Sequence, residues 1–254
     1  MNRVLVIGLN SFRENLRERL LYNLVFFALL LIGSSILLSR LHLGDNSRLI
    51  LDLGLACINL FGVFIAVFIG IGLVSKEIEK KTIYTIISKP VPRYEFLLGK
   101  YLGLTITLLV NTAIMLVGLL AVLAVMDVAV TLLLFKAVLL IFMELMVIMA
   151  VAMLFSTFTT TTLSAIFTLA IYVIGHLIGD VKALGAKLDA VSRAILTGLY
   201  YVLPNLENFN IKGRVIHQLD VGGTEIALAL AYGVLYTGML LLLAGLIFQR
   251  RDFR

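Results

Sequence analysis

The stretch that decides the fold is the uncharged run LMVIMAVAMLFSTFTTTTLSAIFTLAIYVIGHLIG, residues 145–179. At ~1.5 Å rise per residue a helix of this length would be roughly 50 Å long, whereas the hydrocarbon core of a bilayer is about 30 Å thick. The run therefore contains a turn. Hydroxyl side chains, which favour turns and helix N-caps, mark its place: Ser156, Thr157, Thr159, Thr160, Thr161 and Thr162. We expect one span before the turn, reaching back through Glu144 and Lys136, and another from Leu163 to Gly179.

Four further stretches are free of Asp, Glu, Lys and Arg and are long enough to cross a membrane once. They are Leu20 to Ser39, Leu53 to Ser75, Tyr101 to Met126 and Ile226 to Gln249. The sequence therefore predicts an all-α membrane protein with six transmembrane helices in a single domain, residues 1–254.

Composition excludes most other classes of protein. Of the 254 residues, 61% are hydrophobic and 14% are charged, against about 25% charged in an average soluble domain. Together with the mean hydropathy of +1.08, this excludes a soluble, disordered or fibrous chain. The single cysteine, Cys57, excludes an internal disulfide and a cysteine metal cluster.

The distribution of positive charge predicts the topology. Residues 1–19, 76–100 and 250–254 carry 13 of the 21 Lys and Arg residues, and cytoplasmic segments are enriched in these residues. We therefore expect an inner (plasma) membrane protein with both termini in the cytoplasm. The net charge of +6 is explained by this asymmetry, and no nucleic-acid-binding pattern accompanies it. The uncharged turn after span four is assigned to the cytoplasm by the parity of the spans alone.

The first 19 residues predict an amphipathic helix lying along the inner leaflet. Apolar residues recur at helical spacing from Leu5 to Leu20, and the charged residues from Arg13 to Glu18 lie on the other side. Cleavage of a signal peptide is not expected, because no clear small-x-small site follows and five more spans do.

Residues 75–100, SKEIEKKTIYTIISKPVPRYEFLLGK, join spans two and three on the cytoplasmic side. Nothing before Pro90 breaks a helix that continues span two through Ile87, and Pro90 and Pro92 then end it. We expect a second short helix after Pro92, with Gly99 letting the chain enter span three. In a membrane protein of unknown class, such a stretch would be read as an ordinary charged loop.

These residues also resemble a known family. The pattern Glu77-x-Glu79-x-x-Thr82, then Ser88-x-Pro90-Val91-x-Arg93, then Gly99-Lys100 resembles the coupling region of ABC-2 type transporter permeases. The segments FST at 155–157, LPNLENFN at 203–210 and FQRRDF at 248–253 are similar to that family too. The resemblance is closest to the branch with permeases linked to nitrous-oxide-reductase copper-site maturation.

The resemblance implies the architecture of an ABC-2, or type V, exporter. It comprises an N-terminal interfacial helix at 1–19, a cytoplasmic coupling hairpin at 76–100 and short outer re-entrant helices within 180–225. It also implies contacts with a separate ABC ATP-binding subunit through one set of residues: Glu77, Glu79, Thr82, Ser88, Pro90, Arg93, Gly99 and Lys100. ATP and Mg would be bound by that partner, since Tyr101 follows Gly99-Lys100 and the chain lacks a P-loop there. We therefore expect no enzyme activity and no cofactor in this chain.

Few ionisable side chains lie at membrane depth, where they are costly. Lys136 is near the outer end of span four and is expected to snorkel. Glu144 is nearer the middle, and two interpretations stay open: it lines a polar pathway or carries a proton, or it is neutral and hydrogen-bonded to a neighbouring helix. With Met146 and Met149 it forms our set of pathway candidates. Without Cys or His on that face, the methionines are not expected to bind a metal.

Two other features concern packing and the outer side. Gly62, Ala66 and Gly70 form a stripe of small residues on span two that allows close approach of another helix, which we expect to be span five. Within 180–225, Ala194 to Leu203 suits a short re-entrant or interfacial helix that Pro204 ends. His176 is expected at the outer interface, in contact with solvent.

The resulting functional prediction is a permease subunit of an ATP-driven ABC transporter, exporting a lipid-like, amphipathic or otherwise undefined substrate. Its expected partners are two copies of the ATP-binding subunit, a second copy of this permease or a homologous one, and membrane lipid, but no nucleic acid. The alternative is a non-transporting membrane module that transmits ATP-driven change to an outside partner. An intramembrane enzyme using His176 or Glu144 is a third, less favoured, hypothesis, because no nucleophile or HExxH motif accompanies them.

Overall fold

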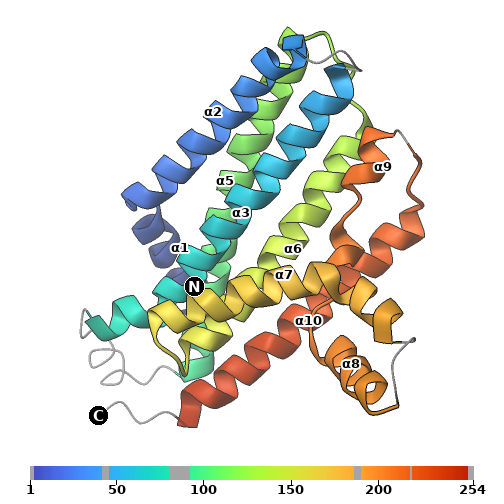
Figure 1. Cartoon of the computed structure of the whole chain (residues 1–254). Coiled ribbons are helices and arrows are strands. Elements are labelled where there is room, and N and C mark those ends of the chain that lie inside the picture. Colours follow the sequence, from blue (N-terminus) through green and yellow to red (C-terminus); the bar gives the residue numbers. More distant parts are fainter. Residues whose placement is uncertain (1–2, 42–45, 80–91, 186–189, 218, 251–254) are drawn as a thin grey trace.

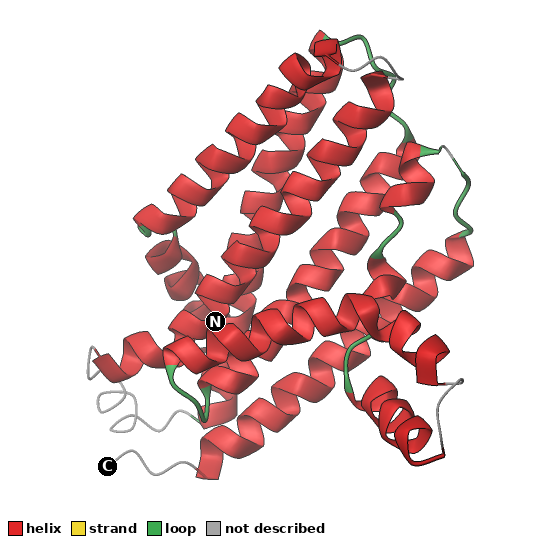
Figure 2. Ribbon diagram, viewed as in Figure 1, coloured by secondary structure: helices red, strands yellow, loops and turns green. Residues whose placement is uncertain are grey.

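The computed structural model describes residues 3–41, 46–79, 92–185, 190–217 and 219–250, and these residues form helices and their connections. The elements are α1 (Arg3–Asn15), α2 (Arg19–Leu41), α3 (Asn46–Glu79), α5 (Arg93–Val125), α6 (Leu132–Ser156), α7 (Thr161–Gly185), α8 (Ala190–Val202), the 3-10 helix η1 (Leu206–Phe209), α9 (Lys212–Ile216) and α10 (Gly223–Arg250). No strand occurs among the described residues, and Figure 2 shows helices joined by short loops.

Six of these helices are long and apolar enough to cross a membrane, which confirms the predicted number of spans. The spans are Arg19–Ser39, Ser47–Gly72, Tyr94–Val125, Leu132–Ser156, Thr161–Gly179 and Gly223–Phe248. Figure 1 shows the C-terminal end of α10 at the same end of the molecule as α1 and the start of α5. An even number of crossings brings both ends of the chain to one side of the bundle.

The predicted turn between spans four and five is confirmed, and its hydroxyl groups explain it. The Ser156 hydroxyl donates to the carbonyl of Met153 at 2.8 Å, and the Thr157 hydroxyl donates to that of Leu154 at 2.6 Å. Thr159 and Ser164 hydrogen-bond to each other across the turn at 2.6 Å. The last carbonyls of α6 therefore have side-chain partners where the helix cannot supply them.

Helices α3 and α6 form the centre of the bundle. In each of these two helices, 72% of the most apolar stretch of 18 residues is buried inside the molecule. The corresponding share is 39% in α5, 28% in α2 and 22% in α7 and α10. The poorly buried helices expose apolar side chains, which suits lipid or another membrane subunit better than water. Glu144 on α6 is completely buried in this centre, between helices that are apolar almost throughout.

Within one chain, the small-residue stripe on α3 contacts α6 and not span five, so the expected contact is not made inside the protomer. A contact with span five of a second protomer stays a prediction. A Cβ added at Gly62 would stand 2.5 Å from Cδ1 of Leu145, and one at Gly70 would stand 2.7 Å from Cβ of Ala152. Ala66, between them, is fully buried. Small residues at every fourth position leave a groove along one side of α3, and α6 fills it because it is the neighbouring helix in the bundle.

Helix α1 packs closely against the first turns of α5 through glycine. A Cβ at Gly99 would stand 2.8 Å from Cβ of Ile7 and 2.9 Å from the carbonyl oxygen of Val4. A Cβ at Gly103 would collide with the carbonyl oxygen of Gly8. The missing side chains therefore let the two backbones touch.

We expected a separate short helix between Pro92 and Gly99, and this is wrong. Pro92 precedes the first turn of α5, as predicted, but α5 then continues without interruption from Arg93 to Val125. A continuous helix satisfies its own backbone hydrogen bonds in lipid, and one glycine does not outweigh that constraint. Gly99 therefore allows close packing of α1 and is not a hinge between two helices.

Hydrogen bonds attach the described part of residues 180–225 to the ends of the spans; we call these residues the outer segment, after their predicted location. Helix α8 ends at Val202, just before Pro204, as the sequence predicted. The hydroxyl of Tyr236 on α10 donates to the carbonyl of Val202 at 2.9 Å, and the Tyr232 hydroxyl accepts from the backbone N–H of Asn205 at 2.8 Å. Lys136, near the start of α6, donates to the carbonyl of Val221 at 3.3 Å.

The α1–α5 contact predicts a difference between two glycines. Gly103→Ala places a methyl group against the backbone of Gly8 and should lower the free energy of unfolding by about 1 to 3 kcal/mol through overpacking. Gly238→Ala on α10 is the control, because a Cβ there meets nothing within 4 Å. It should be neutral or stabilising by up to ~1 kcal/mol, because alanine is the better helix former. Equilibrium unfolding in mixed micelles measures both, and equal stabilities would contradict the close contact.

Candidate functional sites

The first candidate site lies where three helices meet, at the end of the bundle that the charge distribution predicts to be cytoplasmic. Lys100 of α5 lies 3.4 Å from a carboxylate oxygen of Glu14 on α1, and the Lys100 ammonium stands 5.7 Å from the centroid of the Phe96 ring. Phe96 in turn stacks on Phe248 of α10, with ring centroids 6.4 Å apart. We call Gly8, Glu14, Phe96, Lys100 and Phe248 the cytoplasmic joint. It ties α1, α5 and α10 together.

The residues predicted to couple to an ATPase fall into three groups. Gly99 and Lys100 are buried in the contact between α1 and α5. Glu77 and Glu79 lie in the last turns of α3 and Arg93 lies in the first turn of α5, but their side chains are outside the described residues. Thr82, Ser88 and Pro90 lie outside the described residues altogether.

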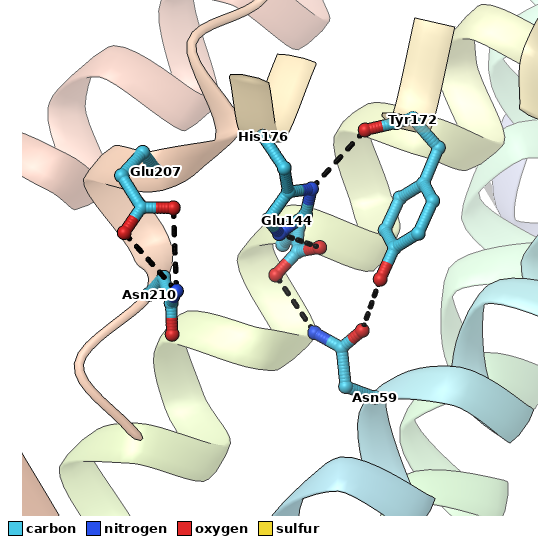
Figure 3. A network of polar contacts seen from close by, with 6 residues as sticks. All are labelled: Asn59, Glu144, Tyr172, His176, Glu207 and Asn210. Atoms are coloured by element: carbon cyan, nitrogen blue, oxygen red, sulfur yellow. Dashed lines mark hydrogen bonds and ion pairs between the residues drawn. The ribbon is translucent and has the colours of Figure 1, made fainter. Parts of the chain in front are cut away.

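The second candidate site is a buried polar cluster in the middle of the spans (Figure 3). Glu144 of α6 accepts a hydrogen bond from the amide of Asn59 on α3 at 2.9 Å. The Asn59 carbonyl oxygen accepts one from the hydroxyl of Tyr172 on α7 at 2.7 Å. The other carboxylate oxygen of Glu144 faces Nε2 of His176, also on α7, at 3.4 Å. We call Asn59, Glu144, Tyr172 and His176 the intramembrane cluster; it joins α3, α6 and α7.

Sequence reasoning found only part of this cluster. Glu144 was singled out because it is charged, and the structure hydrogen-bonds it to a neighbouring helix. His176 was expected at the outer interface in contact with solvent; its side chain is 21% exposed, and its Nε2 faces Glu144 inside the bundle, a contact that the sequence did not predict. Asn59 and Tyr172 were missed, although an asparagine in the middle of an apolar span is itself a signal of a polar contact. The side chain of Asp180, one turn beyond His176, lies outside the described residues.

Charged residues of the outer segment lie near the intramembrane cluster. Burial lowers the pKa of Lys212, at the start of α9, while Glu144, Asp52 and Glu207 favour its charged form. The amide of Asn210 donates to both carboxylate oxygens of Glu207, at 3.1 and 3.2 Å. The outer segment therefore covers the cluster with both positive and negative charge.

The other pathway candidates have packing roles in this chain. Met149 is fully buried, and its backbone approaches Gly70 of α3. Met146 is partly buried, and its carbonyl accepts a hydrogen bond from the Tyr101 hydroxyl at 3.1 Å. Among the described residues, no three His, Cys, Asp or Glu side chains are placed to hold a metal ion.

An outer cavity of about 500 Å³ opens between η1, α9 and the start of α10. Its polar lining includes Glu207, Asn210, Arg214 and Glu225, and Tyr232 lies on its apolar side. Arg214 and Glu225 form an exposed ion pair at its edge.

Comparison with known families agrees with the fold. The family model of the ABC-2 family transporter proteins matches residues 12–253, almost the whole chain. The chain belongs to this family and is a multi-pass membrane permease subunit of an ABC transporter, a class that works with an ABC ATP-binding partner. A search of curated proteins found no match.

The intramembrane cluster predicts that a single hydroxyl contributes to stability. Tyr172→Phe removes the donor to Asn59 and should lower the free energy of unfolding by about 0.5 to 1.5 kcal/mol, the usual range for one hydrogen bond. Tyr201→Phe is the matched control, because Tyr201 is 75% exposed and should change stability by less than ~0.5 kcal/mol. Both variants can be measured by unfolding in mixed micelles. Equal effects would show that the Tyr172 hydroxyl has no structural role.

Proposed function

We propose that this permease exports a lipid-like or amphipathic substrate as one half of a membrane dimer driven by two ATP-binding subunits. The observation that carries the proposal is the cytoplasmic joint. Glu14 and Lys100 of the joint line a small pocket together with Gly72 of α3, and Phe96 and Lys100 lie in the first turns of α5. The joint therefore borders the coupling hairpin expected at 76–100. The second membrane subunit is a copy of this chain or a homologous permease.

The lengths of α3 and α5 support a mechanical role. At ~1.5 Å per residue, α3 extends roughly 10 Å past the cytoplasmic end of its span at Gly72. Because α5 begins at Arg93 and continues into its span without a break, movement of its first turn is carried directly into the membrane. An ATP-binding subunit that pushes on the hairpin would therefore move two long helices.

Contacts within the cytoplasmic joint support transmission of this movement to the rest of the bundle. The glycine contact holds α1 against α5, and the ion pair of Lys100 and Glu14 joins the same two helices. Phe96 connects α5 to α10 through its stacking on Phe248. A push on the start of α5 would therefore displace α1 and α10 with it. The residues that would meet the ATP-binding subunit directly are Glu77, Glu79, Thr82 and Arg93.

The orientation follows from charge. Lys and Arg are concentrated at the end that bears the cytoplasmic joint, so this end is assigned to the cytoplasm of an inner membrane. The apolar residues of α1 that are exposed in the structure, among them Leu5, Val6 and Leu9, would then lie in the inner leaflet. ATP and Mg are bound and hydrolysed by the partner subunits.

The proposed cargo class rests on the apolar surface of the spans. Leu163, Ile166 and Val173 on α7 and Val234 and Leu235 on α10 are exposed, and a path between two permeases would be lined by such residues. An aliphatic lining favours lipid-like or amphipathic molecules. A permease that only transmits force to an outside partner, as the copper-maturation branch suggests, would instead show ATP hydrolysis without movement of lipid.

Charge reversal in the coupling hairpin should abolish assembly. Glu79→Lys and Arg93→Glu should each prevent co-purification of the ATP-binding subunit while membrane insertion stays normal, because both positions flank the expected contact. Glu225→Lys, at the outer end of α10, is the control and should co-purify normally. Normal co-purification of both hairpin variants would show that this region does not bind the ATPase.

The ion pair of the cytoplasmic joint should affect coupling and not assembly. Lys100→Glu places two carboxylates together in a largely buried site and should reduce the ATPase activity of the assembled transporter about fivefold, for a cost of ~1 kcal/mol. The double variant Lys100→Glu/Glu14→Lys should restore most of the activity. Arg214→Glu, which disrupts an exposed outer ion pair, should have no such effect. Failure of the double variant to recover would mean that Lys100 acts through something other than Glu14.

A further inference from the structure

Glu144 is a carboxylate in the middle of the membrane with one oxygen held and one oxygen facing an imidazole. It is fully buried, at a depth where an ionised side chain without compensation is expensive. One oxygen accepts from Asn59 at 2.9 Å, and the other has no conventional hydrogen-bond donor among the described residues. That second oxygen lies 3.4 Å from Nε2 of His176.

The hydrogen bond from Tyr172 determines which side-chain atom of Asn59 faces Glu144. The Tyr172 hydroxyl donates to the carbonyl oxygen of the Asn59 side chain, so the amide nitrogen points toward Glu144 and donates (Figure 3). This hydrogen bond uses no proton of Glu144. Whether Glu144 carries a proton therefore depends on its other carboxylate oxygen, which faces His176.

The backbone determines the tautomer of His176. Its Nδ1 lies 3.1 Å from the carbonyl oxygen of Tyr172, and a carbonyl oxygen only accepts, so Nδ1 carries a hydrogen. In the neutral ring, Nε2 then has a lone pair, and the Glu144 oxygen that it faces must carry a proton to make a bond. In the charged ring, Nε2 carries a hydrogen and Glu144 is ionised. Both arrangements place one proton between the two side chains.

We propose that Glu144 and His176 bind a single proton between them inside the membrane, and that this shared proton holds α7 to the α3–α6 centre. Without it, a buried carboxylate oxygen would face a lone pair on nitrogen. The cluster provides polar contacts from α7 to both α6 and α3, and α7 is one of the least buried spans.

The charged groups around the pair act in opposite directions. Lys212 of α9 and Glu207 of η1 are charged groups of opposite sign near both side chains, and Asp52 of α3 is near Lys212.

The proposal predicts the sign of a pH dependence. An isolated glutamate loses its proton near pH 4.3 and an isolated histidine near pH 6.5. The folded pair keeps its proton at higher pH than the separated side chains, so its contribution to stability is complete between about pH 5 and 6.5 and is lost as pH rises. Above pH 6.5, and until the folded pair itself loses its proton, the equilibrium constant for folding should fall about tenfold per pH unit for this one proton.

The test is equilibrium unfolding of the permease alone in mixed micelles between about pH 5 and 9. Glu144→Gln keeps the shape of the side chain, accepts from Asn59 and donates to His176 without a titratable proton. The number of protons taken up on folding, read from the slope of stability against pH, should therefore be lower by one in this variant than in the wild type. Glu207→Gln is the control, because it removes a nearby carboxylate outside the pair, and it should keep the full one-proton dependence. An identical pH dependence of Glu144→Gln and the wild type would overturn the proposal.

Two further variants distinguish a shared proton from two independent sites. His176→Gln should remove the same one-proton dependence, and it also serves as the test if Glu144→Gln does not fold. The double variant Glu144→Gln/His176→Gln should show no additional loss. Additive changes in the double variant would show that the two side chains titrate separately and would contradict the proposal. Because no ATP-binding subunit takes part, this result is independent of the proposed transport function.

Discussion

The close contact of α3 and α6 is the constraint on which the rest of the bundle depends. Lipid is as apolar as leucine, so burial of apolar side chains does not by itself drive two helices together in a membrane. Gly62, Ala66 and Gly70 remove the side chains that would keep α3 and α6 apart, and dispersion contacts between the helices then become numerous. With this pair fixed, Asn59 and Glu144 meet across it, and α7 gains a polar attachment to the centre.

The same kind of close contact occurs a second time, at the end of the bundle predicted to be cytoplasmic. Gly8, Gly99 and Gly103 bring the backbones of α1 and α5 into contact there. A contact between backbones cannot adjust by rotating side chains. The two glycine contacts therefore define two closely packed parts of the molecule, the α3–α6 centre and the cytoplasmic joint. In the transporter that we propose, ATP-driven movement enters at the joint and must pass the centre.

Within the α3–α6 centre, the intramembrane cluster is where α7 gains its polar contacts. Only 22% of the most apolar stretch of α7 is buried, so Tyr172 and His176 add to its packing on the centre. In our proposal, loss of the shared proton weakens this attachment.

The sequence by itself determined the class of the molecule: six spans, the turn after Ser156, the helix that ends before Pro204 and the family. These follow from length, hydropathy and local hydrogen bonding, which act within one segment of chain. Only the tertiary structure decided that the stripe on α3 meets α6, that Gly99 lies inside a continuous helix, and that His176 faces Glu144. Asn59 and Tyr172 stand 113 positions apart. Contacts of this kind depend on how the helices rotate and pair, and hydropathy contains no information about the side of a helix that an apolar neighbour will cover.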